Sequence, residues 1–194
     1  MKKQKQNTQS IIQAMPTRTA LLPVFAVSLA TSGFVLSANA NERKTAIITF
    51  DAPGAGTGST FQGTLVAGIT PAGVITGGVI DANQVEHTYL RFPDGTFTTF
   101  DAPGAGTGPF QGTGPNGINP AGAIVGPYTD ASNVNHGFMR AKNGTITTFD
   151  APGAGTGPGQ GSFVFSEAIN NAGAIAGAYF DSSNVLHGFL RGGE

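Results

Sequence analysis

Three histidines recur along the chain at intervals of about 50 residues, each in the same local sequence. They are His87, His136 and His187. Three neutral imidazoles form a recognised zinc site with an open fourth position, and such a site would support a metal-dependent hydrolase or lyase. In a threefold body the three could converge on one axis. The strict repetition favours a second interpretation, in which each histidine is a strand residue bound by a neighbouring turn and holds no metal.

Two sets of repeated aspartates could also bind ligands. The first set, Asp51, Asp101 and Asp150, opens glycine-rich loops, and the second, Asp81, Asp130 and Asp181, opens short polar loops. The glycine-rich loops lack the Lys-Ser/Thr ending of a P-loop and the Gly-Asp order of calcium-binding β-rolls. One carboxylate per polar loop is too little charge for a tight calcium site. We therefore expect no cofactor, and expect the first set to cap turns through backbone amides.

The polar residues are nearly identical from copy to copy, whereas catalysis usually needs different residues in different roles. No Ser-His-Asp arrangement stands out in the sequence, and it has no phosphoryl-transfer or dinucleotide motif. Cysteine is absent, which excludes disulfides, thiol catalysis and cysteine-ligated metals. The sequence thus favours a binding protein over an enzyme, and identifies no catalytic residue.

The elements that must position these residues are themselves repeated. The segment Asp-Ala-Pro-Gly-Ala-Gly-Thr-Gly occurs at residues 51–58, 101–108 and 150–157. A second block begins Gly-Ile-Thr-Pro-Ala-Gly at residue 68 and returns twice, and each histidine lies in a third block that closes the unit. We divide the chain into units of about 50 residues, at 45–93, 94–142 and 143–192.

Each unit has the features of four short strands joined by turns. In the first unit the expected strands are residues 46–50, 64–69, 74–80 and 85–92. Asp94-Gly95 and Asn143-Gly144 predict two-residue type I′ hairpins, which would make the last strand of one unit the neighbour of the first strand of the next. We therefore expect one separate four-stranded sheet per unit. We further expect the N-terminal strand to complete the third sheet and so hide its open edge.

Four-stranded antiparallel units of this length predict an all-β fold of propeller-like blades. The units resemble the bacterial extracellular HAF repeats, whose His-Ala-Phe signature stands here as His136-Gly137-Phe138 and His187-Gly188-Phe189. The first copy reads His87-Thr88-Tyr89. The resemblance covers residues 45–191 and implies an exported, propeller-like protein, without supplying catalytic residues. Three blades are few for a ring, so a homodimer completing a ring is one solution, and a threefold β-prism or trefoil-like body is the alternative.

The first 40 residues have the pattern of an export signal. A basic start precedes an apolar stretch that ends in Ala38-Asn39-Ala40, which predicts cleavage after Ala40 and a secreted or periplasmic protein. Four of the 10 basic side chains lie before residue 41, so 6 basic stand against 11 acidic side chains after it, a net charge of −5. This charge argues against nucleic acid as a partner, and no membrane partner is expected once the signal is removed.

The sequence therefore predicts residues 41–194 as a single repeat domain. Its expected function is that of an exported, non-enzymatic scaffold that presents loops to a ligand or protein partner of unknown identity. The alternative is a secreted polysaccharide hydrolase or lyase, metal-dependent through the three histidines.

Overall fold

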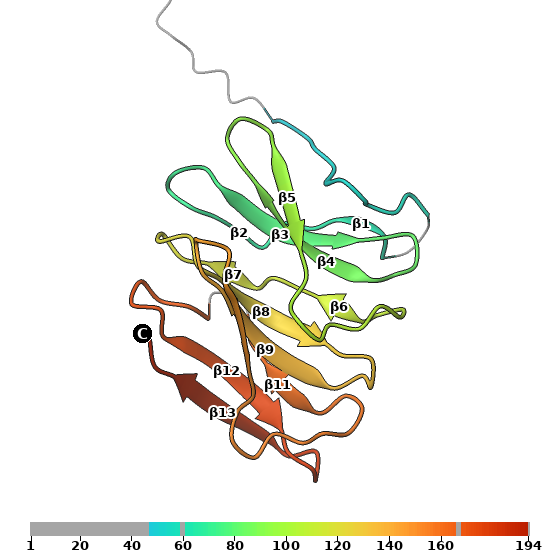
Figure 1. Ribbon diagram of the computed structural model, residues 1–194, viewed down its shortest axis with the longest axis vertical. Coiled ribbons are helices and arrows are strands. Elements are labelled where there is room, and N and C mark those ends of the chain that lie inside the picture. Colours follow the sequence, from blue (N-terminus) through green and yellow to red (C-terminus); the bar gives the residue numbers. More distant parts are fainter. Residues whose placement is uncertain (1–46, 59–60, 166–167, 194) are drawn as a thin grey trace, which may run out of the picture. The chain divides into compact units, whose positions relative to one another are not determined.

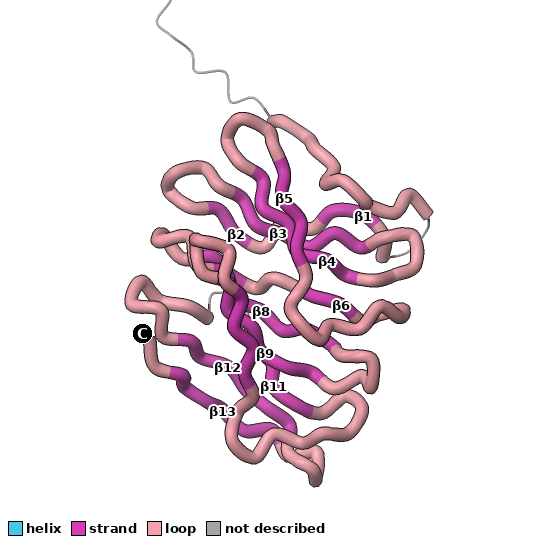
Figure 2. The backbone as a smooth tube through the Cα atoms, viewed as in Figure 1, coloured by secondary structure: helices cyan, strands magenta, loops and turns pink. Residues whose placement is uncertain are grey.

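The computed structural model describes residues 47–58, 61–165 and 168–193. All regular elements in these ranges are β-strands, and they form one open mixed sheet of 13 strands (Figures 1 and 2). The predicted all-β class is confirmed. The described part of the chain contains no helix of the length and hydropathy that a membrane span requires. The predicted signal peptide, its cleavage after Ala40 and residues 41–46 lie outside the described residues.

The strands in chain order are β1 (Gly63–Thr64), β2 (Gly68–Ile69), β3 (Ile75–Ile80), β4 (Glu86–Arg91), β5 (Phe97–Phe100), β6 (Gly112–Thr113), β7 (Gly117–Ile118), β8 (Ile124–Thr129), β9 (Asn135–Arg140), β10 (Ile146–Phe149), β11 (Gly161–Phe163), β12 (Ile175–Phe180) and β13 (Leu186–Arg191).

Three antiparallel hairpins form the longest pairs of the sheet, and each histidine lies on the second strand of one. They are β3–β4, β8–β9 and β12–β13, and each pairs six residues with six in the same register. In the first, Ile75 lies opposite Arg91 and Val79 opposite His87. The repeated sequence therefore places each histidine at an equivalent position of the sheet.

Glycine fixes the short turns, as the sequence predicts for the β2–β3 link, where Gly73 has a φ of +80°. The β4–β5 turn differs from the predicted type I′ hairpin. Phe92 N–H donates to the Thr96 carbonyl and Gly95 has a φ of +89°, whereas Asp94 is not among the residues with positive φ. A three-residue loop with one left-handed glycine results, because Asp94 instead accepts from the Thr96 N–H at 2.9 Å. β5 still pairs with β4, as expected.

The expected strand over residues 64–69 is split into β1 and β2 by a bulge. Thr64 lies opposite Val79 and Gly68 opposite Thr76, so this side has one more residue than β3. The Tyr89 hydroxyl donates to the Leu65 carbonyl at 2.9 Å within the bulge. A buried side chain, rather than β3, thus satisfies this backbone group.

The separate sheets predicted from the sequence are joined into one. β5 covers only the last four residues of β4, so the start of β4 keeps an open edge, and β6 pairs there in parallel, with Gly112 opposite Glu86. Gly161 of β11 lies opposite Asn135 of β9 in the same way. The glycine-rich loops at 101–108 and 150–157 therefore return the chain from β5 to β4 and from β10 to β9.

The predicted closure by an N-terminal strand is wrong for the described residues. Residues 47–50 form no strand, and the pairing path begins at β1 and ends at β13. Phe50 instead packs edge-on against Tyr89, with ring centroids 6.4 Å apart. This contact places Phe50 on the first repeat, away from β13.

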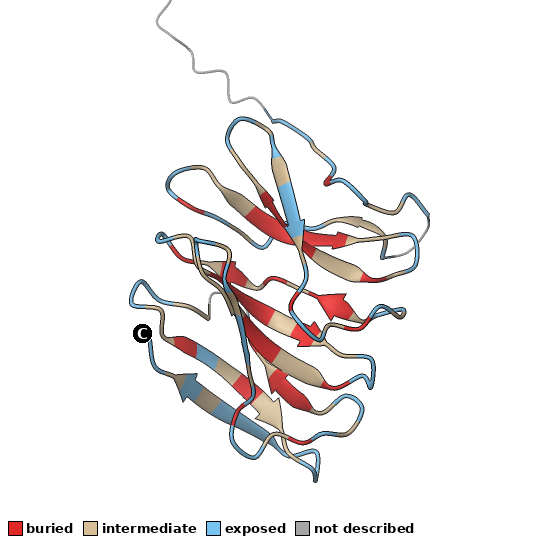
Figure 3. Ribbon diagram, viewed as in Figure 1, coloured by how far each residue is buried: buried red, intermediate tan, exposed pale blue. Residues whose placement is uncertain are grey.

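The core consists of three clusters of aromatic and aliphatic side chains, and both faces of the hairpins contribute to it, since the successive β4 residues Tyr89 and Leu90 are both buried (Figure 3). Tyr89 and Phe138 are fully buried, and the rings of Phe100 and Phe138 meet edge to face at 6.1 Å. The arginines that end β4, β9 and β13 each lie over a phenylalanine ring; the guanidinium carbon of Arg140 lies 4.8 Å from the centroid of the Phe100 ring. The guanidinium–ring attraction favours this placement.

Candidate functional site

Each histidine lies beside aspartates from the neighbouring loops. The Nδ1 atom of His136 is 3.0 Å from the Asp150 carboxylate, and its Nε2 atom is 3.5 Å from Asp130. Because an ionised carboxylate only accepts hydrogen bonds, the Nδ1–H of His136 donates. His87 has the same partners in Asp101 and Asp81, and His187 contacts Asp181 at 3.3 Å. The histidine bound by a neighbouring turn, which the sequence favours, is the arrangement found.

The three histidines do not come together. They lie on β4, β9 and β13, and the pairing path sets each three strands from the next. At about 4.8 Å per strand this separation is about 14 Å, far beyond the Zn–N distances of one site. In the described ranges, no three His, Asp, Glu or Cys side chains are grouped to hold a metal. The zinc site proposed for the alternative hydrolase or lyase is therefore not formed by His87, His136 and His187.

The two aspartate sets have roles other than those the sequence suggests. Asp101 and Asp150, expected to cap turns, bind histidines, and the amide that follows each is bound by a hydroxyl of the next strand, as when Ala102 N–H donates to Thr113 at 2.9 Å. The turns are capped by the second set. Asp181 accepts from the N–H groups of Ser183 and Val185 at 2.8 and 2.9 Å.

Backbone donation stabilises the ionised form of the second set. The hydrogen bond from the Val185 N–H is the main reason that the pKa of Asp181 is lowered. Burial alone would raise the pKa of Asp130, but the amides of Val134 and Ser132 outweigh it and lower the pKa. These carboxylates are occupied in holding the β-turns.

Two of the three histidines carry a tyrosine ring stacked on them. Tyr128 stacks on His136 with centroids 4.8 Å apart, and Tyr179 stacks on His187 at 4.9 Å. The equivalent residue opposite His87 is Val79. A hollow of about 300 Å³ lies there, lined by Pro53, Gly54, Val79, Asp81, His87 and Thr99. The first repeat therefore has an open site where the other two are filled.

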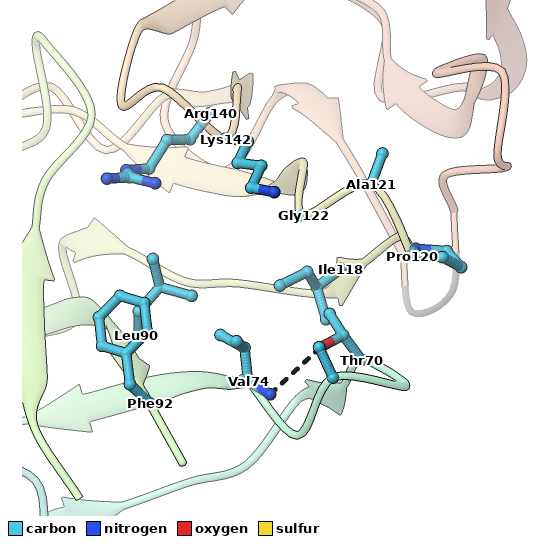
Figure 4. A pocket seen from close by; sticks show the side chains of 11 residues that line it. Thr70, Val74, Leu90, Phe92, Ile118, Pro120, Ala121, Gly122, Arg140 and Lys142 are labelled. Carbon is cyan, nitrogen blue, oxygen red and sulfur yellow. Dashed lines mark hydrogen bonds between the residues drawn. The ribbon is translucent and has the colours of Figure 1, made fainter. Parts of the chain in front are cut away.

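A second hollow, of about 220 Å³, lies between the β2–β3 and β7–β8 turns (Figure 4). Val74, Leu90 and Phe92 form its apolar floor, and Arg140 and Lys142 lie across from them. Burial lowers the pKa of Arg140. An apolar surface beside two cations is suited to a small apolar ligand that carries an anionic group.

Glu86 is an acidic group in an unfavourable environment beside the parallel bridge. Its carboxylate lies over Gly78 and Gly114, and burial raises the pKa of Glu86 despite the opposing attraction of His87. Asn135 occupies the equivalent position on β9 and donates to the Gln160 carbonyl at 3.2 Å. At this position the neutral amide of Asn135 thus makes a hydrogen bond, whereas the Glu86 carboxylate is desolvated.

We expect Glu86→Gln to raise the melting temperature at pH 7. A carboxylate with a raised folded-state pKa destabilises the fold when ionised, and this cost fades as pH falls through the raised pKa and is gone below the unfolded value of 4.5. The gain measured by calorimetry should therefore shrink between pH 7 and about pH 4. Asp94→Asn serves as a control of opposite sign, because the Thr96 amide lowers the pKa of Asp94. A gain for Glu86→Gln that does not depend on pH would contradict the explanation.

Sequence reasoning missed the tyrosines, although alignment of the repeats carries the signal: Val79 stands where Tyr128 and Tyr179 stand. It also missed the pairing of histidines with aspartates of the following loop, because that contact joins two units. Comparison with protein-family models, curated proteins and solved structures finds no match to this chain.

Proposed function

We propose that the chain is an exported, non-enzymatic scaffold of three propeller-like blades. It binds protein through the two ends of its sheet and small ligands through its loops. Its first protein partner is a second copy, and two chains complete a six-bladed ring. The observation that carries the proposal is that both ends expose apolar side chains whose equivalents inside the sheet are buried.

The C-terminal end is formed by β13 (Figure 3). Leu190 is 77% exposed, whereas Leu90, at the same position on β4, is 6% exposed because the second repeat covers it. Val185 and Leu186 are also more than half exposed, while Val85 and Val134 are buried. The last strand thus carries the side chains of an interior strand.

The N-terminal end carries the complementary surface. Ile69 is 64% exposed, and Leu65 and Val66 beside it are exposed as well. Ile118, the equivalent of Ile69 in the second repeat, packs in the same core cluster as Leu90. Ile69 of one copy on Leu190 of another would repeat this contact.

Head-to-tail contacts of this kind produce either a closed ring or an open filament. Six blades are within the range of known propellers, and three are not. Closure at two copies removes both open edges, which would otherwise invite aggregation. We therefore expect a dimer that does not grow further.

The test is sedimentation velocity of the wild type and three variants. Leu190→Lys places a charge in the proposed interface and should weaken association at least tenfold. Gly63→Ala should do the same, because the equivalent Gly112 approaches the Glu86 carbonyl too closely for a Cβ. Phe110→Lys, a matched control at a residue 71% exposed between the ends, should leave the dimer intact. Unchanged association of both Leu190→Lys and Gly63→Ala would refute the interface.

A further inference from the structure

The hollow in the first repeat has the contacts of a tyrosine-binding site. In the second repeat, the Tyr128 ring stacks on His136, its side chain hydrogen-bonds to Thr148, and it lies against Gly104. A Cβ added to Gly104 would be 3.6 Å from the ring. In the first repeat the equivalents of these three residues are His87, Thr99 and Gly54, and all three line the hollow. Only the ring itself is missing, because Val79 is too short to supply it.

The other contacts around the hollow are also the same as in the second repeat. His87 is held by Asp101 at 2.9 Å, as His136 is held by Asp150. Its Nε2 atom is 3.9 Å from Asp81, too far for a hydrogen bond. Asp81 is fixed by the amides of Asn83 and Val85. The walls are therefore pre-formed, which reduces the entropy lost when a ligand binds.

We propose that this hollow binds a para-substituted phenol, whose ring takes the place that Tyr128 and Tyr179 fill in the other repeats. The ring stacks on His87 and contacts Val79, and the hydroxyl hydrogen-bonds to Thr99. In the other two repeats, Tyr128 and Tyr179 fill the equivalent space and stack on the equivalent histidines. This proposal rests on the proposed function, in which the loops bind small ligands, and it specifies the chemical class of one such ligand. A free phenol and the side chain of a protein tyrosine have this chemistry in common.

The test is titration of the purified chain with p-cresol, followed by NMR of the backbone amides. Saturable shifts confined to residues around His87, Val79 and Thr99 are expected, with dissociation in the millimolar range as befits so small a ligand. Toluene, which lacks the hydroxyl, should bind several-fold more weakly. N-acetyltyrosinamide, run in parallel, distinguishes the sources: tighter binding than p-cresol assigns the site to a tyrosine residue, and weaker binding assigns it to a free phenol.

Two variants test the proposal, one by removing the site and the other by creating a second site. Val79→Tyr should fill the hollow and abolish p-cresol binding, and Tyr128→Val should create a second p-cresol site beside His136. Tyr179→Val is the replacement if Tyr128→Val fails to fold. Absence of saturable shifts in the wild type, or undiminished binding to Val79→Tyr, would overturn the proposal.

The same samples separate this inference from the proposed assembly. Sedimentation of Val79→Tyr should be the same as that of the wild type, because the Val79 side chain is buried and lines the hollow beside His87, and so does not belong to the exposed apolar surface of Leu65, Val66 and Ile69. A dimer that does not bind p-cresol refutes the phenol site alone. A monomer that binds p-cresol refutes the ring alone.

Discussion

Replacing Gly161 by alanine should destabilise the fold by about 3 kcal/mol or more. Gly161 has a φ of +99°, and an added Cβ would overlap the carbonyl of Asn135 on β9. That carbonyl belongs to the single parallel pair that joins β11 to β9. The clash adds to the cost of a positive φ, so the midpoint of chemical denaturation should fall sharply and β11 to β13 should lose amide protection first. Gly112→Ala should cause a similar loss of stability at the equivalent junction between β6 and β4.

Gly63→Ala is the matched control for the Gly161→Ala prediction. Gly63 also has a positive φ, of +125°, but an added Cβ there meets no atom within 4 Å. At concentrations too low for association, its cost should be the backbone strain alone, about 1–3 kcal/mol. Equal losses for Gly63→Ala and Gly161→Ala would show that the close approach between repeats does not matter for stability.

Removing the ring of Phe138 is the second change with a large expected effect. Phe138 is fully buried in the cluster of Leu90, Ala102, Ile124 and Tyr128, and it meets Phe100 edge to face. Truncation of a buried phenylalanine costs about 3–5 kcal/mol, because contacts are lost and a cavity remains. The melting temperature of Phe138→Ala should fall by roughly 10 °C in calorimetry.

Phe110→Ala is the control for this ring. Phe110 is exposed and packs in no core cluster, so its truncation should change stability by no more than about 0.5 kcal/mol. If Phe138→Ala melted within a degree or two of Phe110→Ala, the second repeat would not have the packed core described above.

Local features of the fold follow from the sequence. Strands β3, β4 and their equivalents coincide with apolar and β-branched segments, and Gly73 takes the positive φ that its turn requires. The order in which β4 has β3 and β5 as neighbours also follows, since a short hairpin forces it. Periodicity and turn chemistry act between residues close in sequence, and these predictions needed nothing else.

Contacts between repeats cannot be predicted from periodicity and turn chemistry. The bridge between Glu86 and Gly112 depends on how far β5 extends along β4, which no motif encodes. For the candidate site, the histidines and both aspartate sets were identified, but their partners were not. The aspartates differ in role because Asp81 is followed by a tight turn whose amides point back to it, whereas Asp101 is placed beside His87 by the pairing of β5.

The central claim, that the two ends of the sheet bind each other between copies, is tested most directly by native mass spectrometry of residues 41–194. We expect one dominant species with twice the mass of residues 41–194, unchanged as the protein is concentrated. A monomer at every concentration would contradict the claim, and so would a ladder of ever larger species, which would show ends that associate without closing.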